Sequence, residues 1–204
     1  MVRPAAKYDS AMAKQADEPL IGHLETVLFH ETTILSRLDE LAREITDDYR
    51  GKELTVIAIL HGGIVFLADL LRRIHLPVRV ETISVSSYHG GTKSSGTVIF
   101  NQLKLPNLEG QHVLLLDDIL DTGRTLAAIE KRLREEGSLE SVRSCVLLDK
   151  KRERAEEVKA DYVGFTIEDH FVVGYGLDYN GRYRNLPLVG ILSPEYMEAG
   201  AVGE

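Results

Sequence analysis

Hydrophobic residues recur along this chain at two spacings that alternate. Four apolar side chains, three or four positions apart, predict an amphipathic helix over residues 30–49. Its apolar stripe consists of Ile34, Leu38, Leu41 and Ile45. A continuous apolar run over residues 55–60 then has the length of a buried strand, and helical spacing returns from Ile64 to Ile74. A strand between two helices is therefore predicted.

The same alternation continues through the middle of the chain. A stripe of Leu126, Ile129 and Leu133 predicts a further helix that ends at Gly137. Further strands are predicted over residues 78–86, 98–104, 112–116 and 142–148. Strands that alternate with helices indicate βαβ units, and hence a parallel sheet covered by helices on both faces.

This topology also predicts where a ligand binds. The loops after Leu60, Leu116 and Leu148 follow three of the predicted strands. In open α/β sheets, ligands bind at the carboxyl ends of the strands. If the three strands belong to one sheet, their loops converge on one site.

Composition indicates a single globular domain. The chain has 204 residues, of which 44% are hydrophobic and 27% charged, which is enough to bury a proper core. We expect this domain over residues 21–193, between a loose arm at 1–20 and a small polar tail at 194–204. The arm lacks the apolar core of a signal peptide, and no segment approaches the ~20 apolar residues of a membrane span.

Charge and cysteine content restrict the function classes. The formal net charge of -8 argues against generic binding to nucleic acid or to an anionic membrane. The single cysteine, Cys145, lies in an apolar run and is expected to be a buried, reduced thiol. A chain without an internal disulfide favours the cytoplasm.

Two carboxylates and a glycine turn join a predicted strand to a predicted helix. Asp117 and Asp118 follow the apolar run, and the loop from Asp121 to Thr125 leads into the helix. Backbone N–H groups at a helix start bind phosphate, and the carboxylates suit ribose hydroxyls or a magnesium ion. Taken alone, the pattern also fits solvated acids before an ordinary turn. A Walker loop is excluded, because its glycine-lysine signature is absent.

Residues 117–125, with the sequence DDILDTGRT, resemble the phosphoribosyl-pyrophosphate loop of type I phosphoribosyltransferases. Residues 161–187 are similar to the base-binding region of hypoxanthine-guanine phosphoribosyltransferases, and three shorter segments agree with this. Those segments are residues 60–71, 87–88 and 147–150. The resemblance covers residues 24–193 and implies the α/β type I fold: a mostly parallel central sheet flanked by helices, with a small hood region over the site.

The resemblance implies magnesium-dependent transfer of phosphoribose from phosphoribosyl pyrophosphate to hypoxanthine, and to guanine, in purine salvage. It implies Asp121 as the general base at the purine N7, and Asp117 and Asp118 as partners of the ribose. Its 5-phosphate site consists of Thr122, Gly123, Arg124 and Thr125.

For the leaving pyrophosphate, the resemblance implies one cation and two loops. Arg184 is the cation, and the turn at His61 and Gly62 lends amides after a cis peptide in many relatives. His61 stands where many relatives have Lys or Arg, so a histidine in a surface turn is an equal alternative. Ser87 and Tyr88 open a Gly/Ser-rich segment that would close over the site.

For the purine, the resemblance implies that Lys150 donates to the 6-oxo group and that Phe171 stacks on the ring. The Val172 backbone and Asp178 would meet the far edge, and Asp178 and Asp117 would ligate Mg²⁺. From its position alone, Lys150 would be a solvated member of a basic cluster.

Two alternatives stay open. One is a phosphoribosyltransferase that prefers xanthine, because the position that distinguishes these bases would be read by main-chain groups. The other is a nucleotide-sensing regulator that binds nucleic acid, which only the basic cluster at residues 150–154 favours. By analogy with its relatives, the chain is expected to form a homodimer or homotetramer.

Overall fold

The computed structural model describes residues 19–87, 98–101 and 106–198. Two sheets and five helical segments make up this part of the chain. The helical segments are η1 (Leu20–His23), α2 (Glu31–Asp48), α3 (Gly63–Leu71), α4 (Arg124–Glu136) and α5 (Pro194–Glu198). The strands are β1 (Leu24–Phe29), β2 (Leu54–Leu60), β3 (Val78–Ser87), β4 (Val98–Phe100), β5 (His112–Leu120), β6 (Ser141–Lys150), β7 (Tyr162–Ile167), β8 (Val172–Val173) and β9 (Val189–Leu192).

The larger sheet has six strands in the order β4-β3-β2-β5-β6-β7. All neighbouring pairs are parallel except β3 and β4. From β2 the chain runs outward to β3 on one side, whereas β5, β6 and β7 follow in order on the other side. The strand order therefore reverses between β2 and β5, and such a switch point leaves a crevice at the carboxyl ends of the two strands.

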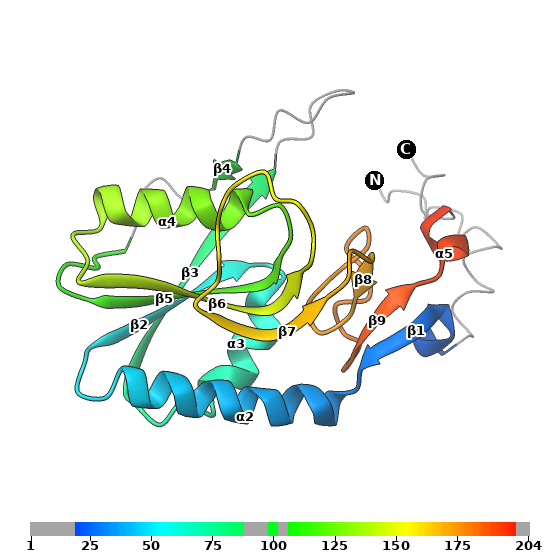
Figure 1. The fold of residues 1–204 in the computed structure, drawn as a ribbon, viewed down its shortest axis with the longest axis horizontal. Coiled ribbons are helices and arrows are strands. Elements are labelled where there is room, and N and C mark those ends of the chain that lie inside the picture. Colours follow the sequence, from blue (N-terminus) through cyan, green and yellow to red (C-terminus); the bar gives the residue numbers. More distant parts are fainter. Residues whose placement is uncertain (1–18, 88–97, 102–105, 199–204) are drawn as a thin grey trace, which may run out of the picture.

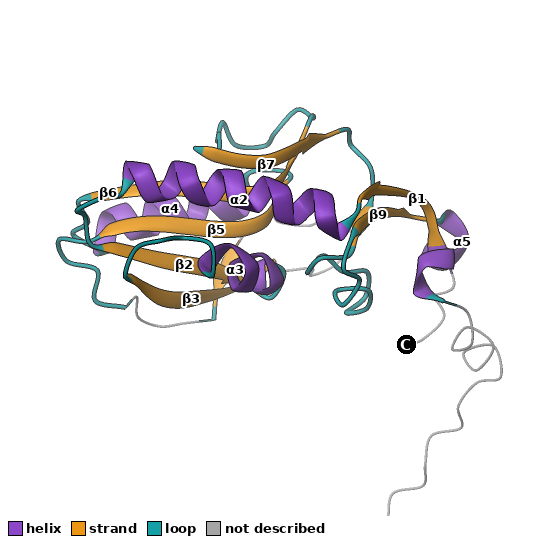
Figure 2. Cartoon of the chain, turned by 90° about the horizontal axis from the view of Figure 1, so that it is seen from below, coloured by secondary structure: helices purple, strands orange, loops and turns teal. Residues whose placement is uncertain are grey.

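Helices cover both faces of this sheet, as predicted. Helix α4 packs on one face, and α2 and α3 on the other (Figure 1). Every residue of the predicted α2 stripe is fully buried, and so are Ile129 and Leu133 of α4. Burial of one such side chain contributes about 1.5–3 kcal/mol, so these stripes fix both helices on the sheet. Figure 2 shows α2 lying along the sheet when the molecule is seen from below.

The smaller sheet lies beyond one end of the larger one and combines segments far apart in sequence (Figure 2). Its antiparallel order is β1-β9-β8, and hydrophobic spacing did not predict these strands. Next to it, the Tyr196 ring of α5 stacks on His23 with ring centroids 4.0 Å apart. Pro194–Glu198 thus forms a helix in the segment that composition described only as a polar tail.

Three predicted strands have other limits in the structure. β5 extends to Leu120 and β6 to Lys150, because the two strands stay paired as far as Leu120 and Asp149. The acidic pair therefore lies within β5 and not in the loop after it. β4 ends at Phe100 and runs antiparallel to β3, whereas residues 102–105 lie outside the described part. Within the described ranges, no helix is long and apolar enough to cross a membrane.

Candidate active site

A cavity of about 540 Å³ lies at the switch point between β2 and β5. It draws residues from the ends of both strands, from the turn before α3, from the start of α4 and from the segment after β8. The predicted site residues among its lining are His61, Gly62, Asp117, Asp118, Asp121, Thr122, Gly123, Thr125, Asp178 and Arg184. The loops after β2 and β5, two of the three strands whose loops were predicted to meet, therefore converge on one cavity.

The acidic pair forms the floor of this cavity. The backbone N–H of Asp118 donates to Asp117 Oδ1 at 3.0 Å, and the Asp117 residue is 9% exposed. Burial raises the pKa of Asp117 well above its ordinary value, and the neighbouring Asp118 charge raises it further. Burial also raises the pKa of Asp118, against the lowering effect of its hydrogen bonds and the Arg184 charge. Hydroxyl groups or a cation at this floor would stabilise the charged form of both carboxyls.

The loop after β5 presents a helix start to the same cavity. Gly123 is the N-terminal cap of α4 and has a φ of 80°, a left-handed conformation that glycine adopts without strain. The first N–H groups of an α-helix have no acceptor within the helix, so they can bind an anion. Thr122 and Thr125 line the cavity, whereas the exposed Arg124 side chain faces a neighbouring hollow.

The turn after β2 approaches the acidic pair closely. The peptide bond between Leu60 and His61 is cis, as the resemblance implies. A Cβ added to Gly62 would lie 1.7 Å from Asp118 Oδ2, so any larger residue would displace that carboxylate from its present position. His61 is exposed and lines the cavity.

Arg184 and Asp178 come from the segment that follows β8. Arg184 Nη2 lies 2.7 Å from Asp178 Oδ1, and Nη1 donates to the Gly176 carbonyl at 2.6 Å. Gly176 packs on the turn after β2, since a Cβ there would lie 2.1 Å from the Gly62 carbonyl oxygen. The segment is thereby held against the cavity, with one cation and one carboxylate facing it.

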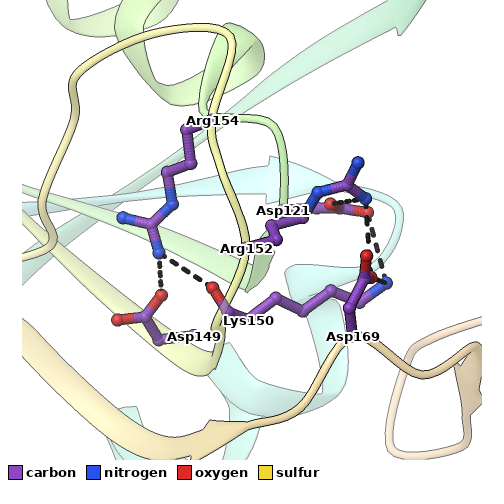
Figure 3. Close-up of polar contacts among 6 residues, drawn as sticks. All are labelled: Asp121, Asp149, Lys150, Arg152, Arg154 and Asp169. Carbon is purple, nitrogen blue, oxygen red and sulfur yellow. Dashed lines mark hydrogen bonds and ion pairs between the residues drawn. The ribbon is translucent and has the colours of Figure 1, made fainter.

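Lys150 and Asp121 meet at the edge of the site (Figure 3). Lys150, 8% exposed, ends β6 and places Nζ 3.3 Å from Asp121 Oδ2 and 3.4 Å from Asp169 Oδ1. Arg152 Nη1 lies 2.8 Å from Asp121 Oδ1 and 3.5 Å from Asp169 Oδ1. Two cations and two carboxylates thus form one cluster.

Of the other predicted purine contacts, Asp178 lines the cavity, whereas Phe171 and Val172 are not among its lining residues. Phe171 is 44% exposed, and its ring meets Tyr179 edge-on. Val172 is buried in β8, opposite Ile191 of β9. Ser87 is the last residue of β3, and Tyr88 lies outside the described residues.

Sequence reasoning missed the roles of Asp169 and Arg152 in this cluster. Arg152 was counted only as part of a basic run, and Asp169 carries no motif. Its place two residues before Phe171 was the one available signal. The pairing depends on the loops after β6 and β7 lying side by side, which spacing along the chain does not reveal.

Comparison with known proteins shows the family to which this chain belongs. Residues 28–180 match the phosphoribosyl transferase domain. The chain is 45% identical to the hypoxanthine-guanine phosphoribosyltransferase of Lactococcus lactis, over 84% of this chain and 93% of the relative. It belongs to the hypoxanthine-guanine phosphoribosyltransferase family. The members of this family are transferases.

Solved structures of the family have the same fold. A hypoxanthine phosphoribosyltransferase from Staphylococcus aureus is 41% identical, with a TM-score of 0.83 over 88% of this chain and 97% of that chain. A Trypanosoma cruzi relative, studied for the role of its C-terminal region in oligomeric state and activity, is 39% identical with a TM-score of 0.79. It covers 88% of this chain and 97% of that chain. The predicted type I fold is confirmed.

Proposed function

We propose that the protein transfers the 5-phosphoribosyl group of phosphoribosyl pyrophosphate to hypoxanthine, and to guanine, for purine salvage. The bond from the anomeric carbon to pyrophosphate breaks, a bond to the purine nitrogen forms, and the products are IMP or GMP and pyrophosphate. One observation carries this proposal: the Asp117–Asp118 floor, the α4 start and Arg184 line a single cavity, and Asp121 joins that cavity to Lys150.

Each part of this arrangement has a proposed task. Asp117 and Asp118 accept hydrogen bonds from the ribose hydroxyls, and the α4 start, from Thr122 to Thr125, binds the 5-phosphate through its N–H groups. The amides of His61 and Gly62, together with Arg184, neutralise the departing pyrophosphate; Ser87 and Tyr88 would close over it. Asp121 accepts the proton at N7 as the purine becomes attached.

Base choice is assigned to Lys150, Phe171 and Val172. Lys150 Nζ would donate to the oxygen at purine position 6, while Phe171 stacks on the ring and the Val172 backbone, with Asp178, meets the far edge. Adenine has an amino donor at position 6, so it would leave buried polar groups unpaired. These proposed roles predict a preference for 6-oxopurines.

The carboxylates of the cavity suit Mg²⁺. Asp117 and Asp178 line the same cavity, and Asp117 forms no ion pair with a described residue. Within the described ranges, no three metal-ligating side chains converge, so the protein alone does not supply a complete set of ligands. Mg²⁺ typically takes one or two carboxylates together with substrate phosphates and water, so Asp178 and Asp117 would hold an ion of this kind. When bound, it would offset the charge of the leaving pyrophosphate.

The geometry gives no support to a regulator that binds nucleic acid. Within the basic cluster, Lys150 and Arg152 pair with Asp121 and Asp169, Lys151 pairs with Glu168, and Arg154 pairs with Asp149. Phosphates of a nucleic acid would have to displace these carboxylates. We therefore propose small-molecule partners only. A cytoplasmic location without membrane association is proposed on the sequence grounds of a single cysteine and an acidic net charge.

A homodimer or homotetramer is proposed as well. This part of the proposal rests on analogy with the relatives and on the general prevalence of symmetric homo-oligomers. Light scattering coupled to size exclusion gives the mass directly, and a monomer at micromolar concentration would refute this part.

A substrate panel tests the reaction. The full chain is mixed with phosphoribosyl pyrophosphate, Mg²⁺ and hypoxanthine, guanine, xanthine or adenine, and nucleotide and pyrophosphate are measured. We expect IMP and GMP, loss of both with a chelator, and adenine used at least about 10²-fold less efficiently. Asp121→Asn should lower kcat by about 10²–10⁴-fold while phosphoribosyl pyrophosphate still binds.

Two results would overturn the proposal. Equal efficiency with adenine, or activity that survives the chelator, contradicts the site as drawn. Higher efficiency with xanthine than with hypoxanthine would establish the xanthine alternative instead.

A further inference from the structure

Asp121 is held by two cations from two directions (Figure 3). Lys150 Nζ approaches Oδ2 at 3.3 Å, and Arg152 Nη1 donates to Oδ1 at 2.8 Å. The Arg152 contact is the shorter of the two. Both carboxylate oxygens are therefore engaged, which restricts rotation of the carboxylate about its own bond.

The two cations differ in how they are fixed. The Lys150 side chain is 9% exposed at the end of β6, whereas the Arg152 side chain is 36% exposed in the following loop. That loop is tied to the loop between β5 and α4, because Ala155 N donates to the Thr122 carbonyl at 3.1 Å. Arg154 also donates to the Val158 carbonyl at 2.8 Å. The backbone thus places Arg152 beside Asp121 even though its side chain reaches solvent.

Asp169 completes the cluster on its far side. Its Oδ1 lies 3.4 Å from Lys150 Nζ and 3.5 Å from Arg152 Nη1. Asp169 lies two residues before Phe171, in the segment that leads into β8. The contacts from Asp121 through Arg152 to Asp169 therefore join the loop between β5 and α4 to the segment that carries Phe171.

We propose that Arg152 is a positioning residue for the reaction: it orients the Asp121 carboxylate toward the purine and ties it, through Asp169, to the purine-binding segment. This inference rests on the proposed function. A carboxylate has about four lone-pair sites, so two remain for the purine when Arg152 and Lys150 each occupy one. Arginine stays protonated, so Arg152 cannot compete with Asp121 for the proton from N7.

Asp169 compensates the charge of the two cations when Asp121 becomes protonated. When Asp121 takes up the proton it loses its negative charge, and the two cations beside it lose one counter-charge. Asp169 then remains as the carboxylate that compensates Arg152 and Lys150. The cluster can therefore keep its geometry while Asp121 alternates between charged and neutral forms.

Steady-state kinetics of Arg152→Ala and Arg152→Lys test this role. Arg152→Ala should lower kcat for hypoxanthine by about 10-fold or more, since misplacement of a reacting group by about 1 Å can cost 10²-fold. The KM for phosphoribosyl pyrophosphate should change less than 2-fold. Arg152→Lys keeps the charge and one donor, so it should recover part of the lost kcat.

Two further variants separate positioning from general damage. Lys151→Ala is the matched control, because this neighbour is exposed and pairs with Glu168 rather than with Asp121. Its kcat and melting temperature should equal those of the unmodified chain. Asp169→Asn should lower kcat by itself but add little to Arg152→Ala, because the two side chains act through one cluster.

The outcomes are distinguishable. If the unmodified chain makes no nucleotide from hypoxanthine, the proposed function fails and the role of Arg152 fails with it. If the unmodified chain is active and Arg152→Ala has the same kcat, only the positioning role is refuted. A rise in the KM for phosphoribosyl pyrophosphate without a fall in kcat, or no recovery with Arg152→Lys, also refutes it.

Discussion

The sugar-phosphate end and the purine end of the site are built in different ways. At the proposed sugar-phosphate end, one continuous segment from Asp117 to Thr125 supplies the floor and the helix start, and backbone N–H groups would do much of the binding. At the purine end, Lys150 at the end of β6 and Arg152 in the following loop form ion pairs with Asp121 and also with Asp169, which lies after β7. The first end depends on backbone shape, the second on pairing between distant segments.

The two ends also differ in how much their charged groups affect the stability of the folded protein. Asp117 is buried and Asp118 half-buried, and desolvation raises the pKa of both carboxyls, so the free protein holds two groups that are costly to ionise. The side chains of Arg152, Asp121 and Asp169 are each about one-third to one-half exposed, where ion pairs contribute little to stability. Substitutions at the two ends should therefore differ in what they change.

Among substitutions that distinguish the two ends, the largest effect is expected from Gly62→Ala at the sugar-phosphate end. The new methyl group would require the Asp118 carboxylate, 1.7 Å away, to leave its place. We expect kcat/KM for phosphoribosyl pyrophosphate to fall about 10²-fold, while the KM for hypoxanthine changes much less. Steady-state kinetics with each substrate varied in turn measure both values.

Gly22→Ala is the matched control for this substitution. Nothing lies within 4 Å of a Cβ at Gly22, and no left-handed φ constrains that residue. Its kinetics should equal those of the unmodified chain. Equal losses for both substrates in Gly62→Ala would mean that the two ends are not separate.

Lys150→Ala, at the purine end, should have a smaller effect. Removing a charged donor to the 6-oxo group costs about 1.5–3 kcal/mol, or about 10- to 10²-fold in kcat/KM for hypoxanthine. Efficiency with adenine should fall less, so the gap between the two bases narrows, and the KM for phosphoribosyl pyrophosphate should stay unchanged. Lys151→Ala again serves as the control. An unchanged ratio of hypoxanthine to adenine would remove Lys150 from base recognition.

The same division explains what sequence could predict. The helices at 30–49 and after Gly123 were found, because a full stripe of apolar side chains is a local signal. The loop at residues 117–125 could be singled out because its residues are contiguous and resemble the phosphoribosyl-pyrophosphate loop of the family. The limits of β5 and β6 were placed too early, because charged residues such as Asp117 and Lys150 stay in a strand when neighbouring strands continue to pair.

Nonlocal features escaped prediction. β1 pairs with β9 across most of the chain, from Leu24 to Leu192, and both strands are short. β8 has only two residues, too few for an alternating pattern. The ion pairs of Asp169 likewise depend on two loops that only the folded sheet brings together.

The smallest effect, and the one that tests how charged groups affect stability, is expected from Asp117→Asn. Because burial raises the pKa of Asp117 in the folded protein, the carboxyl favours the folded state below about pH 3.9, and that contribution is lost as the pH rises through the folded-state pKa. The asparagine cannot ionise. Its melting temperature should therefore exceed that of the unmodified chain by about 2–4 °C at pH 8 for each kcal/mol involved.

The pH dependence makes this prediction specific. Near pH 3, below the ordinary Asp pKa of about 3.9, most of the Asp117 carboxyl is neutral in both states, so the two melting temperatures should converge, and the gap should widen toward pH 8. Asp47→Asn, an exposed carboxylate paired with Arg50, is the control and should show no such widening. Nucleotide formation should fall in Asp117→Asn even though stability rises, since a ribose partner is lost. A variant less stable than the unmodified chain at pH 8 would show that ionisation of the buried Asp117 carboxyl does not destabilise the folded protein.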